Sequence, residues 1–163
     1  MEIKKIKPIT ICIDFDGTCV THEFPLIGKD IGAEPVLKEL VENGHKLILF
    51  TMRSDKEDVH SDNHFIHKKA GQYLTEAVNW FKERNIPLYG IQTNPTQSTW
   101  TNSPKAYGEI FIDDAGLGCP LIYGDFDGFG NGTWFDRPHV DWKEVRNKLV
   151  LMGVLSVENK TSF

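Results

Sequence analysis

The strongest constraint on the fold is the alternation of short, β-branched apolar runs with segments of helical periodicity along most of the chain. Nearly continuous apolar runs are typical of strands buried on both faces, and amphipathic segments are typical of helices packed on a sheet. The predicted strands are residues 9–13, 46–51, 87–91, 109–113 and 119–123. Helices are predicted from residue 34 to a stop at Gly44, from residue 74 to about residue 85, and from residue 141 to a stop at Gly153.

Strands that alternate with helices predict βαβ units and an α/β fold with a mainly parallel sheet. We expect helices on both faces of that sheet, as in a Rossmann-like three-layer α/β/α sandwich. The length of 163 residues, 40% of them hydrophobic, predicts a single domain over residues 1–156, followed by a polar tail, 157–163, that frays. Ligands of such sheets bind at the carboxyl ends of the strands.

Composition excludes several classes of protein. With 18 basic and 23 acidic residues the net charge is −5, which argues against a general nucleic-acid binder. Three cysteines without a CxxC spacing argue against a disulfide framework or a zinc knuckle and favour a reducing, cytoplasmic location. No apolar run approaches the roughly 20 residues of a membrane helix, and the apolar stretch 9–13 is too short for a signal peptide.

The first predicted strand leads into Asp14-Phe-Asp16-Gly17-Thr18. Two carboxylates at a strand exit could bind a hard divalent cation, or could divide the roles of nucleophile and acid. Gly17 permits the sharp bend that such an exit needs. The alternative is an ordinary turn rich in Asp and Gly.

Three further strand-end features follow in the chain. Thr51 closes the second strand, where its hydroxyl could donate to a phosphoryl oxygen or only cap the next turn. Lys105 precedes the strand that ends in Asp113-Asp114. Adjacent carboxylates repel each other unless a cation or hydrogen-bond donors are present, although Asp114 could instead form an Asx turn or a helix cap.

Taken in this order, Asp14-Phe-Asp16-Gly-Thr18, Thr51, Lys105 and Asp113-Asp114 resemble the four motifs of the haloacid dehalogenase (HAD) superfamily of phosphohydrolases. The resemblance covers about residues 9–123. Residues 79–87 and 111–115 also look like short HAD proteins associated with capsule and surface-polysaccharide biosynthesis.

The resemblance implies a Mg²⁺-dependent phosphatase that acts on phosphomonoesters. Asp14 would be the nucleophile that forms an aspartyl-phosphate, and Asp16 would protonate the leaving oxygen and later deprotonate water. Mg²⁺ would be held by the Asp14 side chain, the Asp16 carbonyl and Asp114, with Asp113 as a ligand or as a supporting group. Many family members have Gly-Asp where this chain has Asp113-Asp114.

The resemblance also implies a phosphate-binding set. Thr51 would bind the phosphoryl oxygens, and Lys105 would offset the charge of Asp14 and of the phosphate. Gly17, Met52 and Arg53 are the remaining candidates for contacts with the phosphate.

HAD enzymes carry cap domains either after the first motif or before the lysine motif. Here these segments are residues 19–32 and 93–107, too short for a core that needs about 40 residues. We therefore expect no cap domain, and a site covered only by residues 19–32, the loop after Thr51, or a partner subunit in a homodimer. Such a site suits small esters as well as bulky phosphosugars or polymer ends.

Alternatives stay open. The substrate could be a nucleic-acid 3′-phosphate or a phosphoprotein, and a receiver-like phosphoacceptor module also combines Asp, Thr and Lys on a parallel sheet. His60, His64 and His67 could form a metal site, but a solvated loop is favoured. The second Asp-Phe-Asp-Gly, at residues 125–128, lacks the other motif elements and is interpreted as a surface loop.

Overall fold

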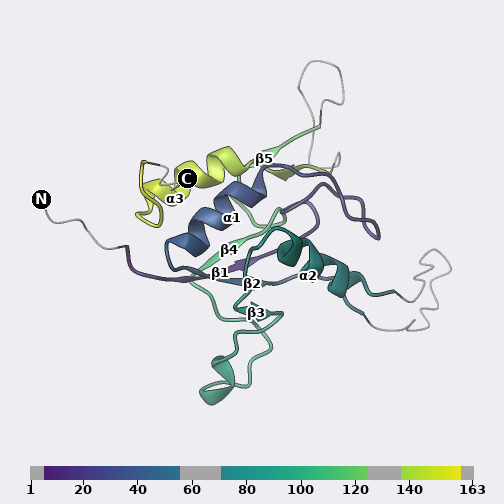
Figure 1. Cartoon of the computed structure of the whole chain (residues 1–163), viewed down its shortest axis with the longest axis horizontal. Coiled ribbons are helices and arrows are strands. Elements are labelled where there is room, and N and C mark those ends of the chain that lie inside the picture. The colour runs from purple at the N-terminus through teal and green to yellow at the C-terminus, as the bar shows by residue number, and fades with distance from the viewer. Residues whose placement is uncertain (1–5, 56–70, 125–136, 159–163) are drawn as a thin grey trace, which may run out of the picture.

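The computed structural model describes residues 6–55, 71–124 and 137–158 (Figure 1). His60, His64 and His67 and the second Asp-Phe-Asp-Gly therefore lie outside the described residues. In chain order the elements are β1 (Thr10–Ile13), α1 (Ala33–Glu42), β2 (Lys46–Leu49), α2 (Tyr73–Glu83), β3 (Gly90–Ile91), a 3-10 turn (Gln97–Thr99), β4 (Ile110–Ile112), β5 (Leu121–Ile122), β6 (His139–Val140) and α3 (Trp142–Leu151). The predicted alternation of strands and helices is confirmed from β1 to β3, and among the described residues after β3 the next α-helix is α3.

Four strands form one parallel sheet in the order β3-β2-β1-β4. Ile11 of β1 pairs with Leu47 on one side and with Ile110 on the other. The prediction of a mainly parallel sheet is therefore confirmed. The predicted strand at 119–123 is shorter and does not join this sheet, because Leu121 and Ile122 pair antiparallel with β6.

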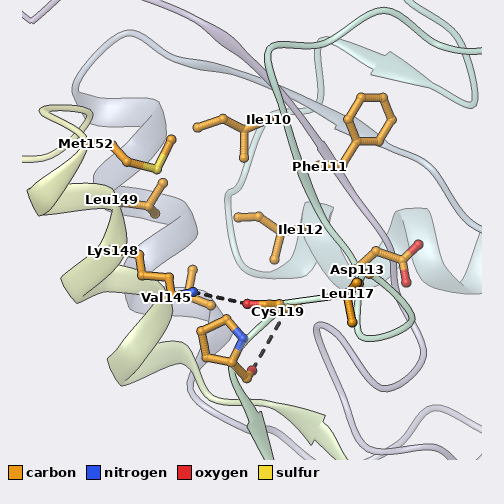
Figure 2. Close-up of a pocket in the computed structure, with 13 residues that line it drawn as sticks. Ile110, Phe111, Ile112, Asp113, Leu117, Cys119, Val145, Lys148, Leu149 and Met152 are labelled. Atoms are coloured by element: carbon orange, nitrogen blue, oxygen red, sulfur yellow. Dashed lines mark hydrogen bonds between the residues drawn. The ribbon is translucent and has the colours of Figure 1, made fainter.

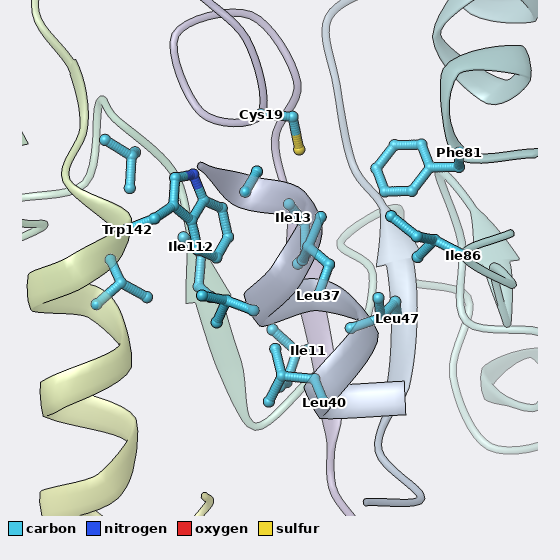
Figure 3. Packing of buried hydrophobic residues seen from close by; sticks show 14 of the residues in the cluster. Ile11, Ile13, Cys19, Leu37, Leu40, Leu47, Phe81, Ile86, Ile112 and Trp142 are labelled. Atoms are coloured by element: carbon cyan, nitrogen blue, oxygen red, sulfur yellow. The ribbon is translucent and has the colours of Figure 1, made fainter. Parts of the chain in front are cut away.

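One face of the parallel sheet carries the main core. Ile11 and Ile13 alternate with Cys12, so they share a face, and Leu37 and Leu40 of α1 pack over them (Figure 3). Helices α2 and α3 add Phe81 and Trp142 to the same cluster from either side, together with Ala77, Trp80, Val145 and Leu149. Complete burial of a side chain such as Leu37 stabilises the fold by about 2 kcal/mol.

The opposite face has a much smaller cluster. Cys12 and Ile48 are buried there with Ala106, and Phe50 and Tyr89 pack against them. Among the described residues no helix contributes to this cluster, so the second helical layer of the expected three-layer sandwich is absent from this part of the chain.

The strand order explains that difference. The connections from β1 to β2 and from β2 to β3 step in one direction, so right-handed crossovers place α1 and α2 on the same face. The connection from β3 to β4 steps back and must cross the other face. Its residues, 92–109, are rich in Asn, Thr, Ser and Pro and form only the 3-10 turn, so a loop covers the face where a helix was expected.

Residues 19–32, here called the flap, connect β1 to α1 without a helix of their own. The flap closes on itself where the Thr21 amide donates to the Lys29 carbonyl at 3.0 Å and the Lys29 amide donates to Thr21 Oγ1 at 2.9 Å. None of the helices in the described ranges is long and apolar enough to cross a membrane.

Candidate active site

The carboxylates Asp14, Asp113 and Asp114 of the predicted site lie where β1 and β4 end side by side. The chain leaves β1 toward β2 and β3 and then returns to β4 on the other side of β1, so the strand order reverses between β1 and β4, the position where ligands of such sheets bind. The Asp14 amide donates to the Ile112 carbonyl at 3.0 Å, which fixes the first motif against the fourth. The expected proximity of the carboxylates at these strand ends is thus present in the structure.

Three of these carboxylates form a cluster. One oxygen each from Asp14, Asp113 and Asp114 lies within 4.8 Å of the others, and all three residues are half-buried. Oxygen-only ligands at this spacing suit a hard cation such as Mg²⁺ rather than zinc. The residues present therefore fit the cofactor that the resemblance implies.

Each carboxylate of the cluster accepts at least one hydrogen bond from the surrounding protein. The Thr18 hydroxyl donates to Asp14 Oδ2 at 3.0 Å, and the Ala115 amide donates to Asp113 Oδ1 at 2.8 Å. His22 Nε2 lies 2.8 Å from Asp114 Oδ2. These contacts hold the side chains in place while leaving oxygens for a ligand.

The turn that carries Thr18 is held by the C-terminal third of the chain. The Trp142 indole donates to the Thr18 carbonyl at 2.7 Å, and the Val140 amide donates to the Gly17 carbonyl at 2.9 Å. Gly17 has a φ of +78°, which a residue with a side chain rarely adopts. Thr18 itself is fully buried, so its hydroxyl has a defined direction.

The carboxyl group of Asp14 is electrostatically unusual. Burial raises its pKa from 3.8 to about 8, and the charges of Asp113 and Asp114 add to the rise. Hydrogen bonds from the Phe15 amide and the Thr18 hydroxyl act in the opposite direction. Without a cation, Asp14 therefore retains a proton near neutral pH, and binding of a cation would favour the carboxylate.

We expect Asp14→Asn to stabilise the cation-free protein at pH 8. Because the folded-state pKa lies above the unfolded one, the folded protein binds this proton more tightly, and stability falls as pH rises from about 4 to about 8. Asparagine removes that loss, so the variant should gain about 5 kcal/mol at pH 8 and less than about 1 kcal/mol near pH 4. Urea unfolding in chelator at both pH values measures this. A variant that is less stable at pH 8 would contradict the prediction.

Asp16, the predicted acid and base, forms an ion pair with Arg53. Its two oxygens accept from Arg53 Nε and Nη2, both at 2.7 Å. Arg53 is 2% exposed, and it also donates to the carbonyls of Leu26, Pro25 and Tyr73 at 2.8–3.4 Å. Arg53 therefore clamps the flap to the first motif, and its predicted contact with phosphate gains no support from this arrangement.

Thr51 lies in the loop just after β2, where its hydroxyl accepts from the Arg53 amide at 3.2 Å. The side-chain amide of Gln92 makes two hydrogen bonds to the backbone of Thr51, as the backbone of a neighbouring strand would. Its Oε1 accepts from the Thr51 amide at 2.9 Å, and its Nε2 donates to the Thr51 carbonyl at 2.6 Å. Met52 is 98% exposed, and its thioether has no proton to donate, so only its backbone amide is suited to a phosphate.

Lys105 is exposed in the loop before β4, with its ammonium 5.4 Å from the centre of the Phe111 ring. Within the described residues no ion pair joins Lys105 to an aspartate. The structure therefore does not bring Lys105 to the carboxylate cluster, and its predicted role there stays a prediction.

Sequence reasoning missed two residues of this site. His22 has no motif of its own, although its place four residues after Thr18 puts it near the first motif. Gln92 follows β3 with a φ of +64° and gives no sequence signal, because its contact with Thr51 spans 41 positions.

An apolar groove of about 220 Å³ lies between β4 and α3 (Figure 2). Ile110 and Ile112 line one side, Leu149 and Met152 line the other, and Asp113 lies at the end away from Met152. The groove therefore adjoins the carboxylate cluster without containing it.

Comparisons with known proteins support the fold and indicate no activity. No protein-family model matches the chain, and no curated protein matches it. The structure is similar to that of a conserved protein from Bacteroides thetaiotaomicron, with 26% sequence identity and a TM-score of 0.60, over 96% of this chain and all of the other. The similarity supports a shared fold over nearly the full length of both chains.

Proposed function

We propose that this protein is a HAD-type phosphatase, a Mg²⁺-dependent hydrolase of phosphomonoesters that works through an aspartyl-phosphate. The observation that carries the proposal is the convergence of Asp14, Asp113 and Asp114 at the neighbouring ends of β1 and β4, within 4.8 Å of one another. Thr51 closes the neighbouring strand, as the HAD motif order requires.

The bound Mg²⁺ would supply positive charge to the phosphoryl oxygens and to the carboxylates around them. In the proposed reaction an oxygen of Asp14 attacks phosphorus while the bond to the ester oxygen breaks. Asp16 gives a proton to that leaving oxygen. Water then attacks the phosphorus of the aspartyl-phosphate, the bond to Asp14 breaks, and Asp16 takes the proton of the water.

This scheme places a demand on Asp16. Both of its oxygens accept hydrogen bonds from Arg53, so Asp16 can exchange a proton with the substrate only when one of those bonds opens. Lys105 likewise must leave the Phe111 ring to offset the charge of the phosphate. Both rearrangements belong to the proposal.

The proposed substrate class follows from how large a molecule can reach the site. Within the described residues the flap reaches the site through His22, and it contains no domain of its own. We therefore propose a bulky phosphomonoester such as a phosphosugar, and a cytoplasmic enzyme, given three free cysteines and a net charge of −5.

The test is hydrolysis of a panel of phosphomonoesters with Mg²⁺, with chelator, and with Mg²⁺ restored. Activity should require the cation, and Asp114→Asn should raise the Mg²⁺ concentration for half-maximal rate at least about tenfold. Asp30→Asn is the matched control, because Asp30 is an exposed aspartate that pairs with Arg84. Hydrolysis that is unaffected by chelator would contradict the metal-dependent mechanism.

A further inference from the structure

His22 is the flap residue that contacts the carboxylate cluster. Its Nε2 lies 2.8 Å from Asp114 Oδ2, and both side chains are largely buried, with exposures of 18% and 15%. The ring lies against Gly17 so closely that a Cβ on residue 17 would be 2.0 Å from His22 Nε2. Glycine at position 17 thus serves two purposes, since it permits the turn and leaves space for the imidazole.

The hydrogen-bond donors near the cluster explain why Asp114 needs His22 as a partner. The Thr18 hydroxyl has a single proton and two carboxylates within reach, Asp14 Oδ2 at 3.0 Å and Asp114 Oδ1 at 3.3 Å. With a cation bound, when Asp14 is a carboxylate, the shorter contact to Asp14 is the better use of that proton. His22 is then the side chain that donates to Asp114, while Asp113 is supported by the Ala115 amide.

We propose that His22 is a positioning residue for the cation site: it fixes the Asp114 carboxylate so that Oδ1 faces the site shared with Asp14 and Asp113. The inference rests on the proposed function, because that function supplies the cation. Groups that orient metal ligands commonly change metal affinity by 10- to 100-fold when removed. His22 also joins the flap to the site, so the flap and the cation should stabilise each other's position.

The experiment measures binding of Mn²⁺, an oxygen-preferring stand-in for Mg²⁺, by the loss of free-ion signal in electron paramagnetic resonance. Wild-type protein, His22→Ala and His22→Gln are titrated without substrate. We expect His22→Ala to bind Mn²⁺ 10- to 100-fold more weakly, and His22→Gln, which places an amide donor near the position of Nε2, to recover most of the affinity.

Thr21→Val is the matched control. It removes the Thr21 Oγ1 acceptor that closes the flap on Lys29, one position before His22, without touching Asp114. Wild-type affinity in this variant supports a direct role of His22, whereas a loss equal to that of His22→Ala means that His22 acts only by keeping the flap folded, which overturns the inference. Thermal unfolding of each variant confirms that it is folded at the temperature of the titration.

The remaining outcomes separate this inference from the proposed function. Wild-type protein that binds no Mn²⁺ overturns both. If the wild type and His22→Ala bind Mn²⁺ with equal affinity, only the role of His22 is overturned. A nitrogen bonded directly to Mn²⁺ in the pulsed spectrum of the wild type, lost in His22→Ala, would make His22 a ligand and would also overturn the positioning role.

Discussion

Under the proposed mechanism, Asp14→Asn is expected to lower the turnover of a phosphomonoester by more than about a thousandfold, because the amide that replaces the carboxylate cannot form the aspartyl-phosphate. The substitution keeps the shape of the side chain, and its oxygen can still accept from the Thr18 hydroxyl. Turnover of a chromogenic phosphomonoester with saturating Mg²⁺ measures the effect. The variant should remain folded, since it loses the cost of burying a charge among Asp113 and Asp114.

Trapping the intermediate makes this test independent of the rate. Wild-type protein quenched in acid during turnover should carry one phosphoryl group on the peptide that contains Asp14, and Asp14→Asn should carry none. A variant that keeps the wild-type rate, or a phosphoryl group on another residue, would show that Asp14 is not the nucleophile.

Arg53→Ala is expected to destabilise the protein by about 3–5 kcal/mol, a large fraction of the stability of a domain of this size. The substitution leaves the half-buried Asp16 carboxylate without the guanidinium that neutralises it. It also removes the donors to the carbonyls of Leu26, Pro25 and Tyr73. It also removes the guanidinium from the face of Phe15, 5.1 Å from the ring centre. Urea unfolding at pH 7 measures the loss.

A double-mutant cycle separates the ion pair from the rest of the clamp. Asp16→Ala combined with Arg53→Ala should cost clearly less than the sum of the single changes, because the two charges no longer stand unpaired. Arg53→Lys should recover little, since an ammonium cannot make the bidentate contact with Asp16. Additive losses in the cycle would mean that Asp16 and Arg53 act independently.

The elements and the location of the site follow from local patterns. The apolar runs around Ile11 and Leu47 predicted buried strands because they lack the alternation of a half-exposed sheet, and the stripe through Ala77 and Phe81 predicted α2. Asp141 predicted the start of α3, where it now accepts from the Glu144 amide at 3.2 Å. The placement of Asp14 and Asp113 at strand ends then followed, because parallel strands end at one edge.

The opposite face of the sheet and the partners within the site were decided only by the tertiary structure. Helices on both faces were expected because strands alternate with helices, but the return from β3 to β4 crosses the second face as a loop. Arg53 was assigned to phosphate, yet it pairs with Asp16 across 37 positions, and His22 meets Asp114 across 92. Motifs and periodicity report a residue's neighbours along the chain, whereas the donor that a half-buried carboxylate finds depends on which segments the folded chain brings within 3 Å.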